Sequence, residues 1–304
     1  MKDRKLKNVP ASIHQRLLNL AREQGRPFNE LVQYYAIERF LYRFSQTSHA
    51  EHFILKGAQM LRVWAAQLTR PTMDVDMLAR VENSIENLVS IVRDCAAVEC
   101  ENDGITFDIE NIRGEEIIKD SKYQGVRVIV RGTIGKIQLR VQIDFGFGDV
   151  IVPGPAWAEL SDTLNMGVPC VLGYSPESSI AEKFQAMIAL DIANTRIKDF
   201  YDIWTLSREC SFDGEMLKKA IATTFEQRNT LLPQEIPLAL TETFSSEPDK
   251  EKLWQAFLRK GRISTEGKTL GEVVKEIENF LMPPTLSAAN EQHFSLTWSE
   301  GNWK

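Results

Sequence analysis

Two aspartates two residues apart are the part of this sequence whose spacing most directly suggests chemistry. Asp74 and Asp76 lie in a short Pro-containing stretch, Thr69–Leu78. In a β-strand, residues i and i+2 share one face, so both carboxylates would lie together while Val75 and Met77 turn into a core. Neighbouring carboxylates stay ionised when a cation lies between them, and Mg²⁺ prefers such oxygen ligands. The pair therefore predicts a metal-assisted phosphoryl or nucleotidyl transferase site. A solvated strand edge or turn is the alternative interpretation.

Two other segments offer groups that could join this pair. Upstream, the apolar run Phe53–Lys56 meets Gly57 and then an amphipathic helical pattern, so backbone N–H groups at that junction could bind a triphosphate. Downstream, residues 136–149 alternate apolar and polar side chains, which predicts a strand with Asp144 on its polar face. Asp144 would then be a third carboxylate beside the first two.

The order and spacing of four local patterns resemble the AbiEii/AbiGii type of nucleotidyltransferase toxin, found in type IV toxin–antitoxin systems. These patterns are Lys56-Gly57 followed by Leu61-Arg62, Arg70-Pro-Thr72-Met-Asp74-Val-Asp76, Ile143-Asp144-Phe-Gly-Phe-Gly148-Asp149, and Glu182-Lys183 followed by Arg196-Ile-Lys198-Asp199-Phe-Tyr-Asp202. The resemblance runs from about Pro10 to Trp204.

The resemblance implies roles for individual residues. It makes Asp74 and Asp76 the metal-binding pair, which Asp144 would complete, and it makes Lys183 a ligand for nucleotide phosphates. Asp199 would help to hold Lys183 or the substrate. The nucleotide-binding residues it implies are Lys56, Gly57, Arg62, Arg70, Thr72 and Lys183. The chain departs from the family pattern at Ala58-Gln59, where relatives carry small or hydroxyl residues, so a side-chain hydroxyl near the phosphates is missing.

The resemblance also implies a reaction and its partners. One or two Mg²⁺ ions would orient an NTP for in-line attack on its α-phosphorus, and Asp144 or Asp76 would help to deprotonate the acceptor. The acceptor would be RNA, such as a tRNA 3′ end, and a cognate antitoxin would relieve the toxicity. Two alternatives stay open: transfer to a hydroxyl of a protein or of a small molecule such as an aminoglycoside, and a non-catalytic nucleotide-binding or interaction module.

Lys183 and Asp199 can meet only if the chain bends between them. They are 16 residues apart, which would place them roughly 160° apart around one continuous helix. Asn194 and Thr195 are plausible break residues, after a helix that Ser178-Ser179 would cap and that would run to about Ala193. Without the resemblance, Lys183 reads as an exposed helix lysine.

Composition and charge set broad limits on function. The 304-residue chain has a net charge of −6, with 43% hydrophobic and 26% charged residues. This composition predicts a soluble cytoplasmic enzyme and argues against a general nucleic-acid coat protein, although a local basic groove could still hold RNA. Candidates for the groove are Arg62, Arg70, Arg196 and Lys198, each of which could equally be a solvated or salt-bridged surface cation.

Several classes of protein are disfavoured. The charged start, Met1–Lys7, is unlike a secretory signal, and no run of about 18 apolar residues predicts a membrane span. The four cysteines lack metal or disulfide spacing and read as reduced thiols. A P-loop is absent from the sequence.

The expected fold is α+β, with a nucleotidyltransferase-type mixed sheet between helical parts. An N-terminal helical segment (1–48) would pack on an α/β core (49–177), followed by a C-terminal helical bundle (178–285) and a polar tail (286–304). In the core, a short glycine-bounded link at 132–135 predicts a hairpin, and residues 152–176 read as an irregular connector. Basic residues followed by two helices allow one rival interpretation of the N-terminal segment, a ribbon-helix-helix DNA-binding module.

Overall fold

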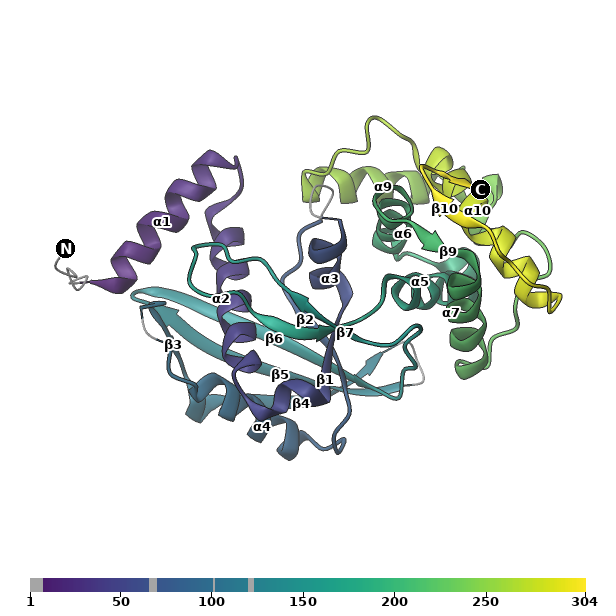
Figure 1. Ribbon diagram of the computed structural model, residues 1–304. Helices are drawn as coiled ribbons and strands as arrows, with labels where there is room; N and C mark the ends of the chain where they lie inside the picture. Colours follow the sequence, from purple (N-terminus) through teal and green to yellow (C-terminus); the bar gives the residue numbers. More distant parts are fainter. Residues whose placement is uncertain (1–7, 66–69, 101, 120–122) are drawn as a thin grey trace. The chain divides into compact units, whose positions relative to one another are not determined.

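The chain forms two compact units, each built from several segments. The computed structural model describes residues 8–65, 70–100, 102–119 and 123–304 (Figure 1), so the charged start and Thr69 lie outside the described residues. The sheet unit comprises Met1–Gln59, Pro71–Gly148 and Trp157–Gly173. The helical unit comprises Met60–Arg70, Asp149–Ala156 and Tyr174–Lys304.

An eight-stranded mixed sheet organises the described part of the sheet unit. Seven strands follow the order β3-β5-β6-β2-β1-β8-β7, and β4 pairs with β5. Strands β1–β2 and β5–β6 are antiparallel, whereas β1–β8 and β2–β6 are parallel. The strands are β1 (Phe53–Lys56), β2 (Val75–Ala79), β3 (Ile105–Phe107), β4 (Arg113–Lys119), β5 (Tyr123–Ile134), β6 (Ile137–Phe147), β7 (Ala156–Glu159) and β8 (Cys170–Gly173).

Alternation along the central strands separates a core face from a polar face, as the sequence predicts. On β6, Leu139, Val141 and Ile143 are buried, and on β2 both Val75 and Met77 are buried. The predicted hairpin is confirmed, because β5 and β6 pair from Ile134 opposite Ile137 onward. The helices and short 3₁₀ turns of this unit are α1 (Val9–Glu23), α2 (Phe28–Ser45), η1 (Ser48–His52), α4 (Ile85–Ala97) and η2 (Ile109–Asn111), and α3 (Gly57–Trp64) follows β1.

Helix α2 packs on the core face of the sheet and is buried on nearly all sides. Its rings meet sheet residues, with Phe44 at 5.7 Å from Phe53 and Phe40 at 6.1 Å from Phe107, measured between ring centroids. Such edge-on aromatic pairs add to the free energy gained by burying the apolar surface. Helix α2 therefore packs on the sheet, which favours a role in the core over the DNA-binding alternative.

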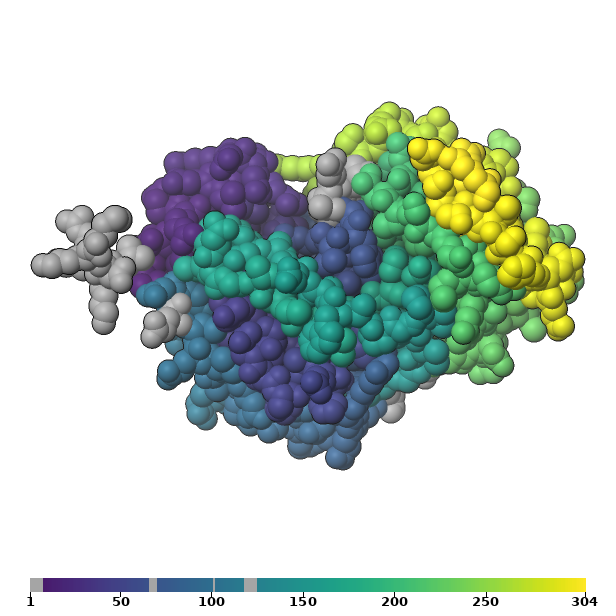
Figure 2. All heavy atoms as spheres, in the orientation of Figure 1, coloured from purple at the N-terminus to yellow at the C-terminus, as the bar shows by residue number. Residues whose placement is uncertain are grey.

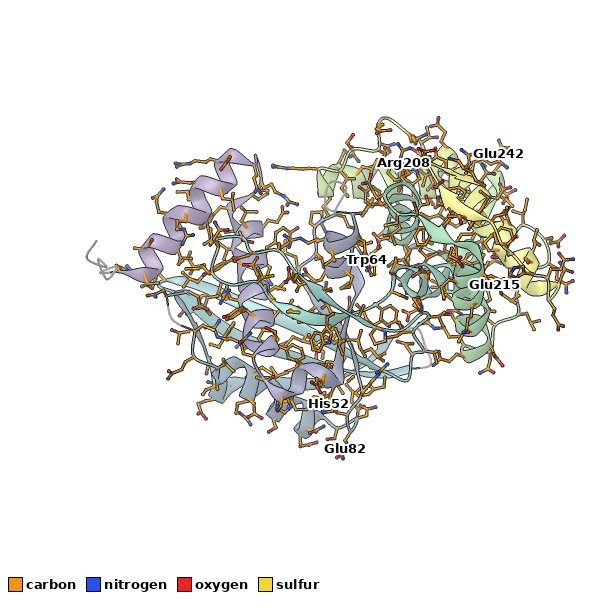
Figure 3. All side chains as sticks on the ribbon, viewed as in Figure 1. His52, Trp64, Glu82, Arg208, Glu215 and Glu242 are labelled. Atoms are coloured by element: carbon orange, nitrogen blue, oxygen red, sulfur yellow. The ribbon has the colours of Figure 1, made fainter. Side chains whose placement is uncertain are left out.

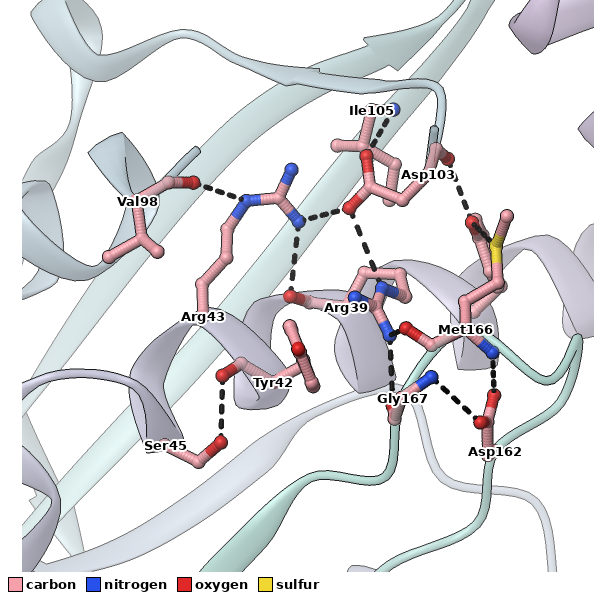
Figure 4. Close-up of polar contacts among 11 residues, drawn as sticks. Arg39, Tyr42, Arg43, Ser45, Val98, Asp103, Ile105, Asp162, Met166 and Gly167 are labelled. Carbon is pink, nitrogen blue, oxygen red and sulfur yellow. Dashed lines mark hydrogen bonds and ion pairs between the residues drawn. The ribbon is translucent and has the colours of Figure 1, made fainter. Parts of the chain in front are cut away.

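The other side of α2 is covered by the connection between β7 and β8, drawn in teal in Figure 2. Arg39 of α2 donates hydrogen bonds to the carbonyl oxygens of Met166 and Gly167, both at 3.0 Å. Asp103 accepts from Arg43 at 2.5 Å and from Arg39 at 3.5 Å (Figure 4). Because these groups are buried, each needs its partners, and the contacts with Asp103, Met166 and Gly167 satisfy the two buried arginines of α2.

The helical unit is a bundle with a small sheet on it. Its helices and turns are α5 (Pro176–Leu190), η3 (Asp191–Ala193), α6 (Ile197–Glu209), α7 (Gly214–Gln227), η4 (Leu238–Leu240), α8 (Glu242–Ser245), α9 (Pro248–Gly261) and α10 (Leu270–Ala289). None of the helices in the described parts of the chain is long and apolar enough to cross a membrane.

Three local expectations are corrected by the structure. Residues 152–176 are not simply an irregular connector, since they include β7 and β8, and Cys170–Gly173 pairs in parallel with β1. The N-cap of α5 is Ser175, whose hydroxyl accepts from the N–H of Ser178, and the helix ends at Leu190. Pro176 explains where α5 begins, because proline suits the first turn of a helix.

The expected polar tail is also corrected. Residues 286–304 contain the end of α10 and two strands, β10 (Thr297–Ser299) and β11 (Asn302–Trp303), which form a three-stranded sheet with β9 (Phe212–Asp213). Two indole N–H groups hold this segment: Trp298 donates to the carbonyl of Ser207 at 2.6 Å, and Trp303 to that of Phe280 at 3.1 Å. Their large apolar rings bury enough surface to order a segment that is polar on average.

Candidate active site

A row of charged side chains crosses the polar face of the sheet unit. Asp76 is the register partner of Asp144 on the parallel neighbour β6, and Lys56 is its partner on β1. Arg127 of β5 lies opposite Asp144, and Glu115 of β4 lies opposite Arg127. Register partners on adjacent strands project from the same face, about 5 Å apart at the backbone. The five side chains therefore form one row. In Figure 3, His52 and Glu82 mark the other end of the β1–β2 pair.

The first aspartate is held two residues before this row. The hydroxyl of Thr72 donates to Asp74 Oδ1 at 2.9 Å, and Thr72 is buried, so its rotamer is fixed by packing. Gln59 Nε2 reaches the carbonyl of Asp74 at 3.4 Å. Asp74 thus precedes the first residue of β2, Asp76 lies within the strand, and both occupy half-buried positions.

Gly57 lets the Asp76 carboxylate sit against the start of α3. Its φ of +66° lies in the left-handed region, and a Cβ there would collide with Asp76 Oδ2. Glycine alone among the residues tolerates both conditions without strain. The predicted glycine turn between an apolar strand and a helix is therefore present, and its backbone brings the helix N-terminus to the acidic row.

Asp144 is held by a two-point ion pair. Arg127 donates from Nε to Oδ1 at 2.8 Å and from Nη2 to Oδ2 at 2.9 Å, and Gln142 Nε2 approaches Oδ1 at 3.3 Å. The Asp144 side chain is 6% exposed and that of Arg127 is 31% exposed. The ion pair with Asp144 raises the pKa of Arg127.

The carboxylates in and beside the row are oxygen ligands of the type that a hard divalent cation prefers. Asp76 and Asp144 come from two neighbouring strands and project to one side, and Asp74 lies just before the first of these strands. As the side chains stand, however, no group of three or more His, Cys, Asp or Glu residues in the described chain is arranged to hold a metal ion. Both Asp144 oxygens accept from the Arg127 guanidinium in this arrangement.

The helical unit holds the other group of predicted site residues in a buried ion cluster. Lys183 Nζ lies 3.0 Å from Asp202 Oδ2 and 3.5 Å from Asp199 Oδ1. Arg70 makes a two-point contact with Asp202, at 2.7 and 3.0 Å, and Arg196 Nε lies 2.6 Å from Asp199. The Lys183 side chain is 11% exposed, so it is not the exposed helix lysine of the alternative interpretation.

Burial and charge act in opposite directions on the acid–base behaviour of this cluster. Burial alone would lower the pKa of Lys183, but Asp202 and Asp199 outweigh it and raise that pKa. Burial alone would raise the pKa of Asp202, but Arg70 and Lys183 lower it to about 2. Both members of the Lys183–Asp202 pair therefore remain charged at neutral pH.

The bend between Lys183 and Asp199 is confirmed. Helix α5 ends at Leu190, and α6 begins at Ile197. Lys250 of α9 donates from Nζ to the carbonyls of Ile192 and Asn194, both at 2.7 Å, so two peptide carbonyls freed by the break have a partner. The break allows two helices, rather than one, to present Lys183 and Asp199 to each other.

The predicted residues fall into two groups, one in each unit. The sheet unit brings together Lys56, Gly57, Thr72, Asp74, Asp76 and Asp144. The helical unit brings together Arg70, Lys183 and Asp199, and it also contains Arg62, half-buried on α3. Arg70 and Arg196 are ion-paired, as the salt-bridge alternative to a basic groove requires.

Sequence reasoning left out two residues, Arg127 and Asp202. Asp202 follows Asp199 by three residues and so shares its helix face, which is a usable signal. Arg127 could have been found from the hairpin register, because pairing from Ile134 opposite Ile137 carries Arg127 to Asp144.

Comparison with solved structures defines the class of fold. A Helicobacter pylori protein described as a candidate nucleotidyltransferase aligns with a TM-score of 0.51 and 16% identity, over 88% of this chain and 99% of that one. At this identity the similarity shows a shared nucleotidyltransferase-type α/β fold, as the sequence predicts. A second structure, JHP933 from Helicobacter pylori, aligns with a TM-score of 0.49 and 15% identity, over 86% and 93% of the two chains, and supports no conclusion here.

The family follows from a match over most of the sequence. Residues 39–276 match the family described as the nucleotidyl transferase AbiEii toxin of the type IV toxin–antitoxin system. The chain belongs to this family. Membership implies nucleotidyl transfer from a nucleotide substrate and an antitoxin partner. No curated protein matches the chain.

Proposed function

We propose that this protein transfers a nucleoside monophosphate from an NTP to a hydroxyl of RNA, at a tRNA 3′ end, as the toxin of a type IV pair. The observation that carries the proposal is the register of Asp76 against Asp144 with Asp74 two residues ahead. It aligns two carboxylates on one face of the sheet, with a third just before the strand, in a chain whose family is described as nucleotidyl transferases.

The row of acids suits this reaction because of what its residues do. Asp74, Asp76 and Asp144 would hold Mg²⁺, which supplies Lewis-acid stabilisation of charge on phosphate oxygens. Thr72 fixes the rotamer of Asp74 through its hydrogen bond at 2.9 Å. Gly57 brings helix N–H groups to Asp76, so the site has backbone donors despite Ala58-Gln59.

Lys183 is the proposed ligand for the β- or γ-phosphate. Its cluster holds three cations, Arg70, Lys183 and Arg196, against two carboxylates, Asp199 and Asp202, among the contacts of the described residues. The ammonium group of Lys183 is a point charge of the kind that binds phosphate oxygens. Asp199 and Asp202 fix the direction of the ammonium group.

The decisive experiment follows label from each α-³²P NTP in the presence of Mg²⁺ and total cellular RNA or protein. Label in a tRNA-sized band that is lost in Asp74→Ala supports the proposal and identifies the base. Asp94→Ala, an exposed carboxylate on α4, is the matched control and should keep full activity. Label in protein or in a small molecule would replace the RNA acceptor, and label that persists in Asp74→Ala would refute the role of the acids.

Nucleotide binding is tested separately by calorimetry with NTP. Lys183→Ala should weaken binding about 10- to 100-fold, the range for a lost hydrogen bond to a charged group. Lys219→Ala, an exposed lysine on α7, should bind NTP as the unchanged protein does. Equal affinity of Lys183→Ala and the parent protein would assign Lys183 a purely structural role.

A further inference from the structure

Arg127 stands out because it occupies the carboxylate that the proposed metal site needs. Both Asp144 oxygens accept from one guanidinium, at 2.8 and 2.9 Å. Such two-point pairs are the strongest contacts that an arginine makes with a carboxylate. Neither the family description nor the patterns of the sequence assigns this residue a role.

The position of Arg127 has an electrostatic reason. Asp76 and Asp144 are register partners on adjacent strands, so their charges repel each other unless a cation compensates. Arg127, opposite Asp144 on the next strand, provides such a charge from within the chain. The row can therefore be folded and charged before any divalent ion arrives.

We propose that Arg127 is a built-in counter-cation that competes with the divalent ion for Asp144 and so sets the affinity of the site for metal. This inference rests on the proposed function. Arg127 donates to both Asp144 oxygens, so a divalent ion held by Asp144 would need at least one of those oxygens in place of the guanidinium. Arg127 is thus a positioning residue and does not itself touch the reacting atoms.

The surroundings of Arg127 allow it to release Asp144. Its side chain is 31% exposed, whereas Arg43, which pairs with the buried Asp103, is 4% exposed. A second acceptor is close: Glu115 Oε1 lies 4.0 Å from Arg127 Nη1, and Glu115 is its register partner on β4. Released from Asp144, the guanidinium can remain paired at the surface.

The test measures Mn²⁺ binding by electron paramagnetic resonance on the full chain, without nucleotide. Arg127→Gln should bind Mn²⁺ about tenfold more tightly than the parent, since the competing charged contact is gone. Arg127→Lys, which keeps the charge but offers one point of contact, should fall between the two. Arg131→Gln removes a charge from the same face of the same strand and should change the dissociation constant less than about twofold.

A second readout keeps the inference testable if Arg127→Gln folds poorly without metal. Its melting temperature in EDTA should be below that of the parent, and Mn²⁺ should raise it by more than it raises the parent's. Should Arg127→Gln stay unfolded even with Mn²⁺, the affinity of Arg127→Lys decides. Equal or weaker Mn²⁺ binding by the folded variants overturns the inference.

One further variant separates this inference from the proposed function. Asp74→Ala should weaken Mn²⁺ binding in both the parent and the Arg127→Gln background. If Asp74→Ala leaves Mn²⁺ binding unchanged, the proposed metal site itself fails. If it weakens binding while Arg127→Gln matches the parent, only the competition by Arg127 is refuted.

Discussion

The two charged groups of this protein differ in burial and in the kinds of charged residue that they bring together. In the row of the sheet unit, together with Asp74, four carboxylates face two cations among the described residues: Asp74, Asp76, Asp144 and Glu115 against Lys56 and Arg127. In the cluster of the helical unit, three cations face two carboxylates. Carboxylates thus outnumber cations among the named residues of the row, whereas cations outnumber carboxylates among those of the cluster.

The two groups differ in burial, which predicts different roles for them. Asp202 is fully buried and Lys183 is 11% exposed, whereas Arg127 is 31% and Glu115 is 61% exposed. Breaking a buried pair leaves a charge without solvent, while exposed pairs exchange partners with water at little cost. The cluster should therefore matter most for stability and the row for ligand binding.

The largest expected effect is that of Asp202→Asn on stability. The substitution leaves Lys183 and Arg70 without their shared carboxylate, so the free energy of unfolding should fall by about 3–5 kcal/mol. Urea denaturation followed by circular dichroism measures it. The exposed Asp249→Asn on α9 is the control and should cost less than about 1 kcal/mol. Equal effects would show that the cluster is not a stabilising unit.

Lys250→Met tests the bend on which the cluster depends. It leaves the carbonyls of Ile192 and Asn194 buried without their donor, which should cost about 1–3 kcal/mol of unfolding free energy. Lys252→Met, on the same helix but 76% exposed, is the matched control. A loss no greater than that of the control would mean that other groups satisfy the break.

Acid should weaken the cluster in a defined pH range. The pKa of Asp202 is lowered to about 2 in the folded state. Its contribution is therefore fully present above the unfolded pKa, near 4, and is lost as pH falls from about 4 to about 2. The difference in unfolding free energy between the parent and Asp202→Asn should shrink by about 2 kcal/mol over that range. A difference that stays constant between pH 5 and pH 2 would contradict the lowered pKa.

The same contrast explains what the sequence could and could not predict. Period-two alternation was enough to place Asp76 and Asp144 on the polar faces of their strands, because strand geometry fixes that outcome. The pairing of Arg127 depended on register. If one strand ended at Arg131 and the next began at Lys136, Arg127 would lie opposite Arg140. The observed strand continues to Ile134, and Arg127 therefore lies opposite Asp144.

The helical unit was harder to predict for another reason. The motif pointed to Lys183 and Asp199, but the stronger partner is Asp202, and the choice between them depends on where α5 ends and α6 begins. If the break between α5 and α6 were a few residues longer or shorter, the second helix would be rotated by hundreds of degrees about its axis. Local sequence patterns do not fix helix ends to that accuracy. The C-terminal segment was predicted to be a tail because it is polar on average. The packing of Trp298 and Trp303 nevertheless orders it.

The smallest expected effect belongs to the outer end of the row. Glu115→Gln should change the unfolding free energy by less than about 1 kcal/mol, because the residue is 61% exposed and its oxygen lies 4.0 Å from Arg127. Its effect on Mn²⁺ is more informative. If Glu115 receives Arg127 when Asp144 binds metal, Glu115→Gln should weaken Mn²⁺ binding about two- to threefold, and this weakening should vanish in the Arg127→Gln background. A double-mutant cycle of Mn²⁺ dissociation constants measures the coupling. Zero coupling would mean that Arg127 is a counter-cation for Asp144 but has no alternative partner on β4. The row would then lack the exchange of partners that distinguishes it from the buried cluster.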